Sequence, residues 1–297
     1  MELNNINEEP RGSTSNEIEV ARVMDLIQSV LGSTDAQLGL RIKEWSLVPN
    51  AEKVAERAKE KLDGDSTTAI PARVAVSVFE ESLWADNGML VEYLSGILAS
   101  ARSTEVPNDR SVAWTSLVGR LSSDQLALHW VLYTAAQERS RNSNYKTVWE
   151  LIDEQIVVEM DVLIRAMNLQ DNALQQIYRV LEAAHGLERE GLLQRLSHGD
   201  GLYLSGEVQY TRGYSYKPLC QYLTFALTPH GVGLLLQALG LTSYWLGDFV
   251  GSEVVSNRVD SVTQLPRIGE ATFIQDFEQW LKNSTGDGKP DSPLIND

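Results

Sequence analysis

The sequence predicts a mainly α-helical protein whose second half contains one β-hairpin. Three observations lead to this fold class. Apolar residues recur at spacings of three and four over most of residues 16–200, which is the period of a helix that buries one face. Ser, Thr or Asn begins several of these segments, where its side chain can cap a helix. Residues 202–227 are instead rich in Tyr and Thr and partly alternate between apolar and polar, as half-buried strands do.

The first half is predicted to be a multi-helix bundle over residues 16–121, preceded by a polar, disordered terminus at 1–15. Asn16 and Glu19 have the spacing of a capping box before the first helix, which extends to Leu31. The other helices expected in the bundle cover residues 38–45, 50–62, 76–83, 90–101 and 112–121.

The segment from Phe79 to Ala101 predicts a buried helical hairpin with a break at residues 85–88. Its first helix places Leu83 on the apolar face. Its second helix is Leu-rich, and the spacing of three and four puts Leu94 and Leu98 in the core. The same register leaves Glu92 on the solvent side.

The second half, residues 122–250, begins with the capping box Ser122-Gln125 and a helix to Ala136. Tyr145–Met167 is expected as one long helix because its apolar residues keep helical spacing throughout. Further helices are expected at 172–184 and 187–196. Two strands should follow at 202–211 and 214–227, joined by a turn at Arg212-Gly213, with Pro218 marking an edge or a bulge.

Thr228 and Pro229 supply a cap and a first helical residue, so a helix should continue from there to about residue 239. This order of helices, hairpin and closing helix is that of a winged helix-turn-helix. Residues 122–250 are therefore predicted to form a winged-helix-like unit with an inserted long helix. Residues 251–282 should add a segment with an amphipathic helix from Thr272, and residues 283–297 a disordered tail.

Charge and cysteine content narrow the functional classes. The net charge of −16 disfavours general nucleic-acid binding, which depends on clustered Lys and Arg. Residues 165–250 contain six Lys or Arg and seven Asp or Glu, so the segment that would contact DNA in a winged helix has no excess of positive charge. Cys220 is the only cysteine, which excludes an intrachain disulfide. The first residues lack the pattern of a secretory signal, and a cytoplasmic protein is expected.

No catalytic, cofactor-binding or metal-binding residue is predicted. Glu80 and Glu81 are adjacent and diverge on a helix. The pair His185 and Glu188 has ligand spacing but no matching second pair, and His198 borders a glycine turn. Residues 228–233 lack the endings of both nucleotide-binding fingerprints, so they are read as a tight strand-to-helix junction.

Two apolar features are interpreted as core. The run Val232–Val250 approaches the length of a membrane span, but Gln237, Ser243 and Asp248 interrupt it. Buried core is the favoured interpretation, and a membrane-active segment is the alternative. The seven dispersed tryptophans are interpreted as core anchors because large aromatic side chains dominate burial.

Several short motifs resemble, in order, those of the bacterial abortive-infection alpha (Abi-alpha) family. They lie between Arg41 and Leu239 and are Arg41-Ile42-Lys43, the hairpin of Phe79–Ala101, Leu121-Ser122-Ser123-Asp124, Leu187-Glu188-Arg189-Glu190-Gly191-Leu192 and Leu227-Thr228-Pro229-His230-Gly231. The chain departs from the family pattern at Ser123, where proline is usual, and at Tyr93, where tryptophan is usual.

The resemblance implies an antiviral, abortive-infection role but no chemistry. The leading hypothesis is a non-enzymatic protein that acts through protein contacts as sensor, regulator or effector. The expected partner is a protein or a phage component, and a homo-oligomer stays open. Alternatives are a winged-helix nucleic-acid-binding regulator, a membrane-perturbing effector and an unrecognised hydrolase. Arg189, Arg195 and Arg212, around the predicted wing, are the candidate partner contacts.

Overall fold

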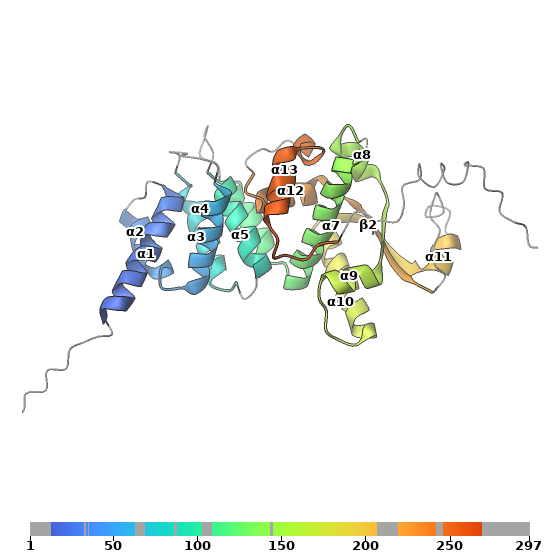
Figure 1. The fold of residues 1–297 in the computed structure, drawn as a ribbon, viewed down its shortest axis with the longest axis horizontal. Helices are drawn as coiled ribbons and strands as arrows, with labels where there is room; N and C mark the ends of the chain where they lie inside the picture. Colours follow the sequence, from blue (N-terminus) through green and yellow to red (C-terminus); the bar gives the residue numbers. More distant parts are fainter. Residues whose placement is uncertain are drawn as a thin grey trace, which may run out of the picture. The chain divides into compact units, whose positions relative to one another are not determined.

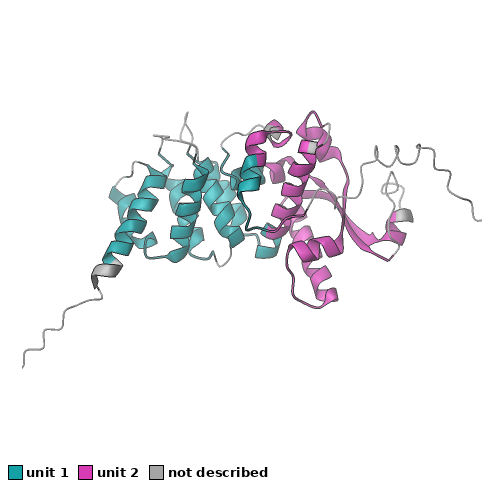
Figure 2. Cartoon of the chain, in the orientation of Figure 1, with its two compact units in different colours: residues 1–126, 233–245, 257–265 teal, residues 127–232, 246–256, 266–297 magenta. Residues whose placement is uncertain are grey.

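The computed structural model describes residues 13–32, 34, 36–62, 69–85, 88–102, 109–142, 145–206, 219–241 and 246–268. The chain forms two compact units (Figure 2). Unit 1 comprises residues 1–126, 233–245 and 257–265, and unit 2 comprises residues 127–232, 246–256 and 266–297. The described part is mainly helical and contains one small antiparallel sheet, so the predicted fold class is confirmed.

Unit 1 contains the predicted multi-helix bundle (Figure 1). Its helices up to residue 118 are α1 (Ser13–Leu31), α2 (Ala36–Trp45), α3 (Pro49–Lys61), α4 (Ala72–Ser82), α5 (Gly88–Ser100) and α6 (Ser111–Val118). Helix α1 begins at Ser13, before the expected capping box at Asn16, so the predicted start at Ile18 was five residues too late. The bundle otherwise follows the helical periodicity of the sequence.

Helix α5 is the centre of unit 1, with contacts to α3, α4 and α6. Leu94 and Leu98 are fully buried, as predicted. Gly96 lies against the backbone of Ala238, where an added Cβ would be 1.9 Å from the carbonyl oxygen. Only glycine permits so close an approach of two backbones. Leu83 at the end of α4 is exposed, which corrects its predicted place in the core.

Glu92 was expected on the solvent side of α5, and this prediction was wrong. Its side chain lies inside unit 1, with the residue only 4% exposed. Arg57 Nε donates to Glu92 Oε2 at 2.8 Å, and Lys61 Nζ lies 2.7 Å from Glu92 Oε1. The latter contact is an ion pair without hydrogen-bond alignment, since Glu92 Oε1 accepts no hydrogen bond. Two cations of α3 therefore explain how a carboxylate is buried in α5.

Lys61 is buried as well, and its amine joins three segments of unit 1. Nζ donates to the Glu92 carbonyl at 2.7 Å, to Ser95 Oγ at 3.0 Å and to the Ala238 carbonyl at 2.7 Å. Burial lowers the pKa of Lys61 to about 8, although the Glu92 carboxylate raises it. Desolvation is the larger effect because a buried ammonium loses its hydration.

Unit 2 has a winged helix-turn-helix order of elements (Figure 1). Along the chain these are α7 (Ser123–Asn142), α8 (Val148–Asp153), β1 (Ile156–Glu159), α9 (Met160–Ala166), α10 (Ala173–Arg189), β2 (Leu193–Asp200), α11 (Gly201–Gly206) and β3 (Gln221–Leu227). The antiparallel sheet has the order β1-β3-β2. Helix α7 begins with the predicted Ser122-Gln125 capping box, and its residues up to 126 belong to unit 1.

The long helix predicted at Tyr145–Met167 is not present. Thr147 caps α8, which ends when Glu154 adopts an extended conformation. Ile156 then pairs with Phe225 and Val158 with Leu223 across the sheet. All of Ile156, Val157 and Val158 are buried. A strand buried on both faces is continuously apolar, so its residues also fit helical spacing, and pairing with β3 decides the outcome.

The hairpin is also displaced from its predicted position. Helix α10 ends at Arg189, and Gly191 follows with a φ of +70°, a conformation that favours glycine. The chain then forms β2 where a helix at 187–196 was expected. Helix α11 (Gly201–Gly206) contains residues 202–206, which were expected in the first strand. The predicted turn at Arg212-Gly213 and Pro218 lie outside the described residues.

The remaining elements are α12 (Pro229–Ala238), the short 3-10 helix η1 (Leu246–Phe249) and α13 (Glu253–Ser261). Thr228 Oγ1 accepts from the Gly231 amide at 2.9 Å, so α12 begins at Pro229 as predicted. Among the helices in the described ranges, none combines the length and apolar character that crossing a membrane would require. The helix expected from Thr272 and the tail at 283–297 lie outside the described residues.

The described tryptophans differ in burial, and Trp114 is half-buried. Trp45 and Trp130 are core anchors, as predicted. Trp84 is 77% exposed and Trp149 is also exposed, so the core interpretation was wrong for these two. Trp245 and Trp280 lie outside the part of the chain whose side chains are described.

Candidate functional site

The candidate site is the exposed face of α10, the helix that precedes the wing strands. Asn172 begins this helix, because its Oδ1 accepts from the Gln175 amide at 3.1 Å. Val180, Ala184 and Leu187 bury the opposite face. In helix-turn-helix proteins the second helix of the pair is the one that presents side chains to a ligand, and α9 and α10 have that order here.

The outward face of α10 is a stripe with an apolar half and a charged half. We call it the α10 stripe; its members are Leu174, Tyr178, Glu182, His185 and Arg189, all exposed. At 3.6 residues per turn these five positions fall within an arc of about 80°. Leu174 and Tyr178 are each 61% exposed. An exposed pair of large apolar side chains on the presenting helix favours a protein surface as ligand.

The three predicted partner contacts have different outcomes. Arg189 is exposed at the end of the α10 stripe and forms no ion pair within the described ranges. Arg195 is exposed on β2 at an irregular position of the strand, with a φ of +53°. Its Nη1 donates to the Asp153 carbonyl at 3.1 Å, so the guanidinium turns toward the end of α8. Arg212 lies outside the described residues.

The other cations of α10 and β2 have acidic partners. Arg179 pairs with Asp171, and Arg195 Nη2 lies 3.8 Å from an Asp153 carboxylate oxygen. A cation that already faces a carboxylate gains less from a DNA phosphate, because it must give up or share that partner. Among the described residues of α10 and β2, Arg189 is thus the one arginine that forms no ion pair.

Two histidines meet where α10 packs on β2. The rings of His185 and His198 lie with centroids 6.2 Å apart, and His185 Nδ1 is 3.6 Å from Glu188 Oε2. The second Glu188 oxygen accepts from the Leu196 amide at 3.2 Å. Across the described residues no group of three or more His, Cys, Asp or Glu side chains is arranged to hold a metal ion. The contacts of Glu188 fix the end of α10 on the sheet.

The segment at 228–233 forms the strand-to-helix junction predicted for it. Thr228 Oγ1 accepts from the Gly231 amide and donates to the Gly191 carbonyl at 2.8 Å. The Gly231 carbonyl lies 3.1 Å from His129 Nε2, and burial lowers the pKa of His129 to about 3. The amide and carbonyl of Gly231 and the carbonyl of Gly191 thus already have polar partners within unit 2.

Sequence reasoning missed Leu174 and Tyr178. The available signal was their phase, since both stand on the side of the helix opposite to Val180 and Leu187. Apolar residues on that side do not belong to the buried stripe. Their exposure follows only once the packing of α10 is known.

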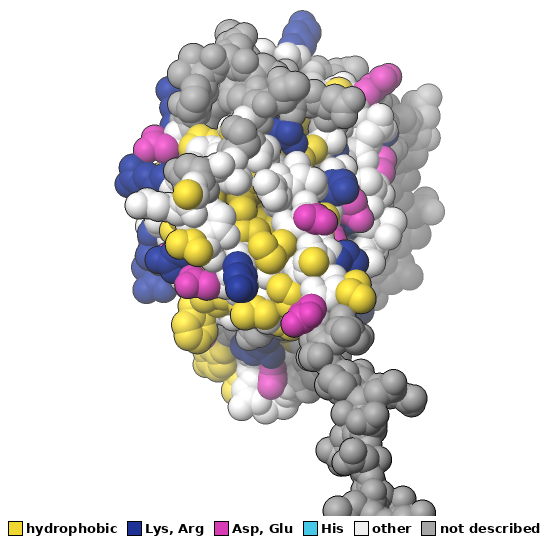
Figure 3. Space-filling model, turned by 90° about the vertical axis from the view of Figure 1, so that its left-hand side faces the viewer, with side chains coloured by type: hydrophobic (Ala, Val, Ile, Leu, Met, Phe, Trp, Pro, Cys, Tyr) yellow, Lys and Arg dark blue, Asp and Glu magenta, His cyan; other side chains and the backbone are white. Residues whose placement is uncertain are grey.

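Unit 1 also exposes apolar side chains. Figure 3 views the end that carries α1 and α2, where hydrophobic side chains gather between charged ones of both signs. Ile18 of α1, Leu40 of α2 and Leu47 after α2 are exposed. A surface that favours anionic lipid combines apolar residues with an excess of Lys and Arg. The mixed charges here give no such excess.

Comparison of the chain with protein-family models, with curated proteins and with solved structures finds no match.

Proposed function

We propose that the protein is a non-enzymatic component of bacterial phage defence that engages a protein partner through the α10 stripe. The observation that carries the proposal is the exposure of Leu174 and Tyr178 on the presenting helix of a winged-helix unit. The partner is a protein of the host or of the phage.

The chemistry of the stripe supports a protein partner over DNA. Tyr and Arg are enriched among the residues that dominate binding energy at protein interfaces. Tyr178 and Arg189 are both available on this face. The neighbouring Arg179 and Arg195 are paired with acids, and the whole chain carries a charge of −16. Both facts weaken attraction to phosphates.

The defence context is supported by the ordered motifs that resemble the Abi-alpha family. Two of them have clear structural roles. The Phe79–Ala101 motif supplies the central helix of unit 1, and the Leu227–Gly231 motif supplies the cap of α12. The mechanism needs no reacting group, because binding a partner is sufficient for a sensor or regulator.

The test is restriction of phage propagation by cells that express the full chain with its neighbouring defence genes. We expect Leu174→Ala with Tyr178→Ala to abolish restriction, because the pair supplies the apolar part of the surface. Leu47→Ala is the matched control, since it shortens an equally exposed leucine in unit 1. Substituting His198 by Gln should leave restriction intact, because His198 lies on β2 outside the α10 stripe.

A photo-crosslinking residue at position 178 identifies the class of partner. During infection it should form a defined protein adduct that is absent when the same residue replaces Leu47. DNA binding is measured in parallel by gel shift over a range of salt concentrations. If Arg189→Gln and Arg195→Gln weakened duplex binding while the Leu174 and Tyr178 variants changed nothing, the nucleic-acid alternative would replace this proposal.

Loss of membrane integrity with an intact α10 stripe would favour the membrane-perturbing alternative. Absence of restriction by the wild-type chain against a broad phage panel would contradict the defence assignment.

A further inference from the structure

We propose that the α10 stripe pairs with the α10 stripe of a second copy of the chain, with the two helices antiparallel about a two-fold axis. The occupant of this exposed helix face is then another molecule of the same protein. The inference does not rest on the function proposed above, because it concerns the isolated chain. A second copy bound there would keep the stripe covered until another partner displaced it.

The spacing of the stripe is symmetric about its centre, as a two-fold contact between identical surfaces requires. Glu182 and His185 lie on either side of the midpoint, and Tyr178 and Arg189 each lie four residues further out. Two antiparallel copies that share this midpoint set Glu182 level with His185 of the second copy. They also set Tyr178 level with Arg189 of the second copy, and the symmetry makes each contact twice.

The charges of the stripe complement themselves in this arrangement. Glu182 and Arg189 are both exposed, and neither forms an ion pair with any residue that the structure describes. They stand seven residues apart, whereas side chains of one helix meet at a spacing of three or four. The antiparallel copy brings its Arg189 to within about one helical turn of Glu182. Each unpaired charge thereby gains a partner of opposite sign.

Tyr178 supplies an aromatic surface for the same contact. Its ring is 61% exposed and would face Arg189 of the second copy. A guanidinium is attracted to the face of an aromatic ring, so the arginine can contact the Tyr178 ring and the Glu182 carboxylate together.

The pairing should be reversible. A stable protein interface buries about 1,200–2,000 Å² in total, and one face of a 17-residue helix on each copy falls short of that. The charge of −16 on each chain also opposes association. At physiological salt this general repulsion is screened beyond about 8 Å, whereas the close pairs of the stripe stay effective. We therefore expect an equilibrium between monomer and dimer.

Sedimentation velocity of the purified full chain at increasing concentration measures this equilibrium, at about 0.15 M salt. The wild type should shift from monomer to dimer as its concentration rises. Arg189→Glu should weaken the dimer at least tenfold, because it sets a carboxylate beside Glu182 of the second copy. The double variant Glu182→Arg with Arg189→Glu should recover most of the affinity, because it exchanges the two charges.

Arg165→Glu is the matched control. Arg165 is exposed in the last turn of α9, as Arg189 is in the last turn of α10, and the substitution changes the net charge equally. Wild-type dimerisation of this variant supports pairing through the stripe. All the substituted positions are exposed, so the variants should unfold at the wild-type urea midpoint.

The proposal is overturned if the wild type stays monomeric, if Arg165→Glu weakens the dimer as much as Arg189→Glu, or if the double variant fails to recover. The measurement uses neither phage nor cells, so its failure is distinct from a failure of phage restriction. A crosslinking residue at position 178 adds a separate check. The adduct with a second copy has twice the mass of the chain and should form without infection, which distinguishes it from an adduct with another partner.

Discussion

Replacing Glu92 by Gln should destabilise the protein far more than the same change at Glu60. Both carboxylates pair with Arg57, but Glu92 is 4% exposed whereas the Glu60 side chain is mostly exposed. Glutamine keeps the shape and removes only the charge. Lys61 then keeps its hydrogen bonds to two carbonyls and a hydroxyl but loses its buried counter-ion.

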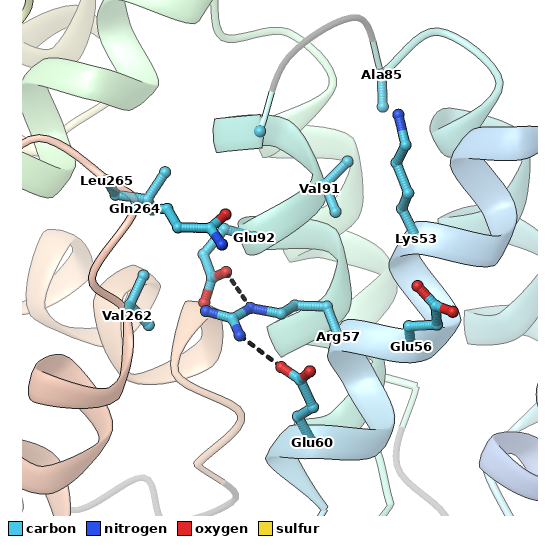
Figure 4. Close-up of a pocket in the computed structure, with 11 residues that line it drawn as sticks. Lys53, Glu56, Arg57, Glu60, Ala85, Val91, Glu92, Val262, Gln264 and Leu265 are labelled. Atoms are coloured by element: carbon cyan, nitrogen blue, oxygen red, sulfur yellow. Dashed lines mark hydrogen bonds and ion pairs between the residues drawn. The ribbon is translucent and has the colours of Figure 1, made fainter.

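The magnitude follows from the titration of Lys61. Removing one member of a buried ion pair costs about 3–5 kcal/mol. The variant can limit this loss by burying Lys61 as the neutral amine. Since the folded wild-type pKa is already about 8, releasing the proton at pH 7 costs only about 1 kcal/mol. The weakened charge-assisted bond from Arg57, drawn in Figure 4, adds about 1.5–3 kcal/mol. The expected loss is therefore about 3–4 kcal/mol at pH 7.

The pH dependence has a definite sign. In the wild type the folded pKa of Lys61 is about 8, below its unfolded value, so the unfolded state binds more protons between pH 8 and 10.5 and stability rises with pH there. In Glu92→Gln the pKa of Lys61 falls further, because the carboxylate that raised it is gone. The stability of the variant therefore starts to rise at a lower pH than that of the wild type. The difference in unfolding free energy between the two proteins should narrow by about 1 kcal/mol from pH 7 to 8.

Urea unfolding at pH 7 and pH 8 measures both quantities, provided that the slope of free energy against urea is unchanged. Glu60→Gln is the control and should cost less than about 1 kcal/mol, as exposed pairs do. Equal losses in the two variants, or a gap that widens with pH, would refute the account of a buried charge. The double variant Glu92→Leu with Lys61→Met should recover most of the loss, because it leaves no buried charge without a partner.

Two core substitutions test the packing of α5 by the same unfolding measurement. Leu94→Ala should cost about 2–5 kcal/mol because it empties a fully buried site, whereas Leu47→Ala at an exposed position should stay within about 0.5 kcal/mol; similar losses would mean that Leu94 is not in the core. Gly96→Ala should cost about 1–3 kcal/mol, since the added methyl group would lie 1.9 Å from the Ala238 carbonyl oxygen and the backbones must separate. An unchanged midpoint would show that α5 and residue 238 are not in contact.

Local sequence determined the positions of most helices in unit 1. Apolar spacing gave α2, α3 and α5, and it identified Leu94 and Leu98 as core residues. The capping box Ser122-Gln125 and the Thr228-Pro229 junction formed as expected, since their hydrogen bonds join residues only three positions apart. Such motifs can be recognised in the sequence because the residues that form their hydrogen bonds are close together in the chain.

The strands were decided by partners distant in the sequence. Ile156, Val157 and Val158 have apolar spacing that suits a helix, but their backbone groups pair with β3, more than sixty residues later. Likewise, β2 replaces a predicted helix because Gly191 ends α10 and the chain then meets Leu227. Pairing with a distant strand overrides local preference when a strand is buried on both faces, because its sequence then shows no alternation of apolar and polar residues.

The candidate sites divide in the same way. The sequence by itself determined a mainly helical chain with a strong acidic balance, and it singled out Arg189, which is exposed. Only the tertiary structure placed Glu92 inside unit 1 and exposed Tyr178 on α10. The reason is that helical phase follows from neighbours along the chain, whereas burial of a charge or exposure of an aromatic ring depends on which surfaces pack together.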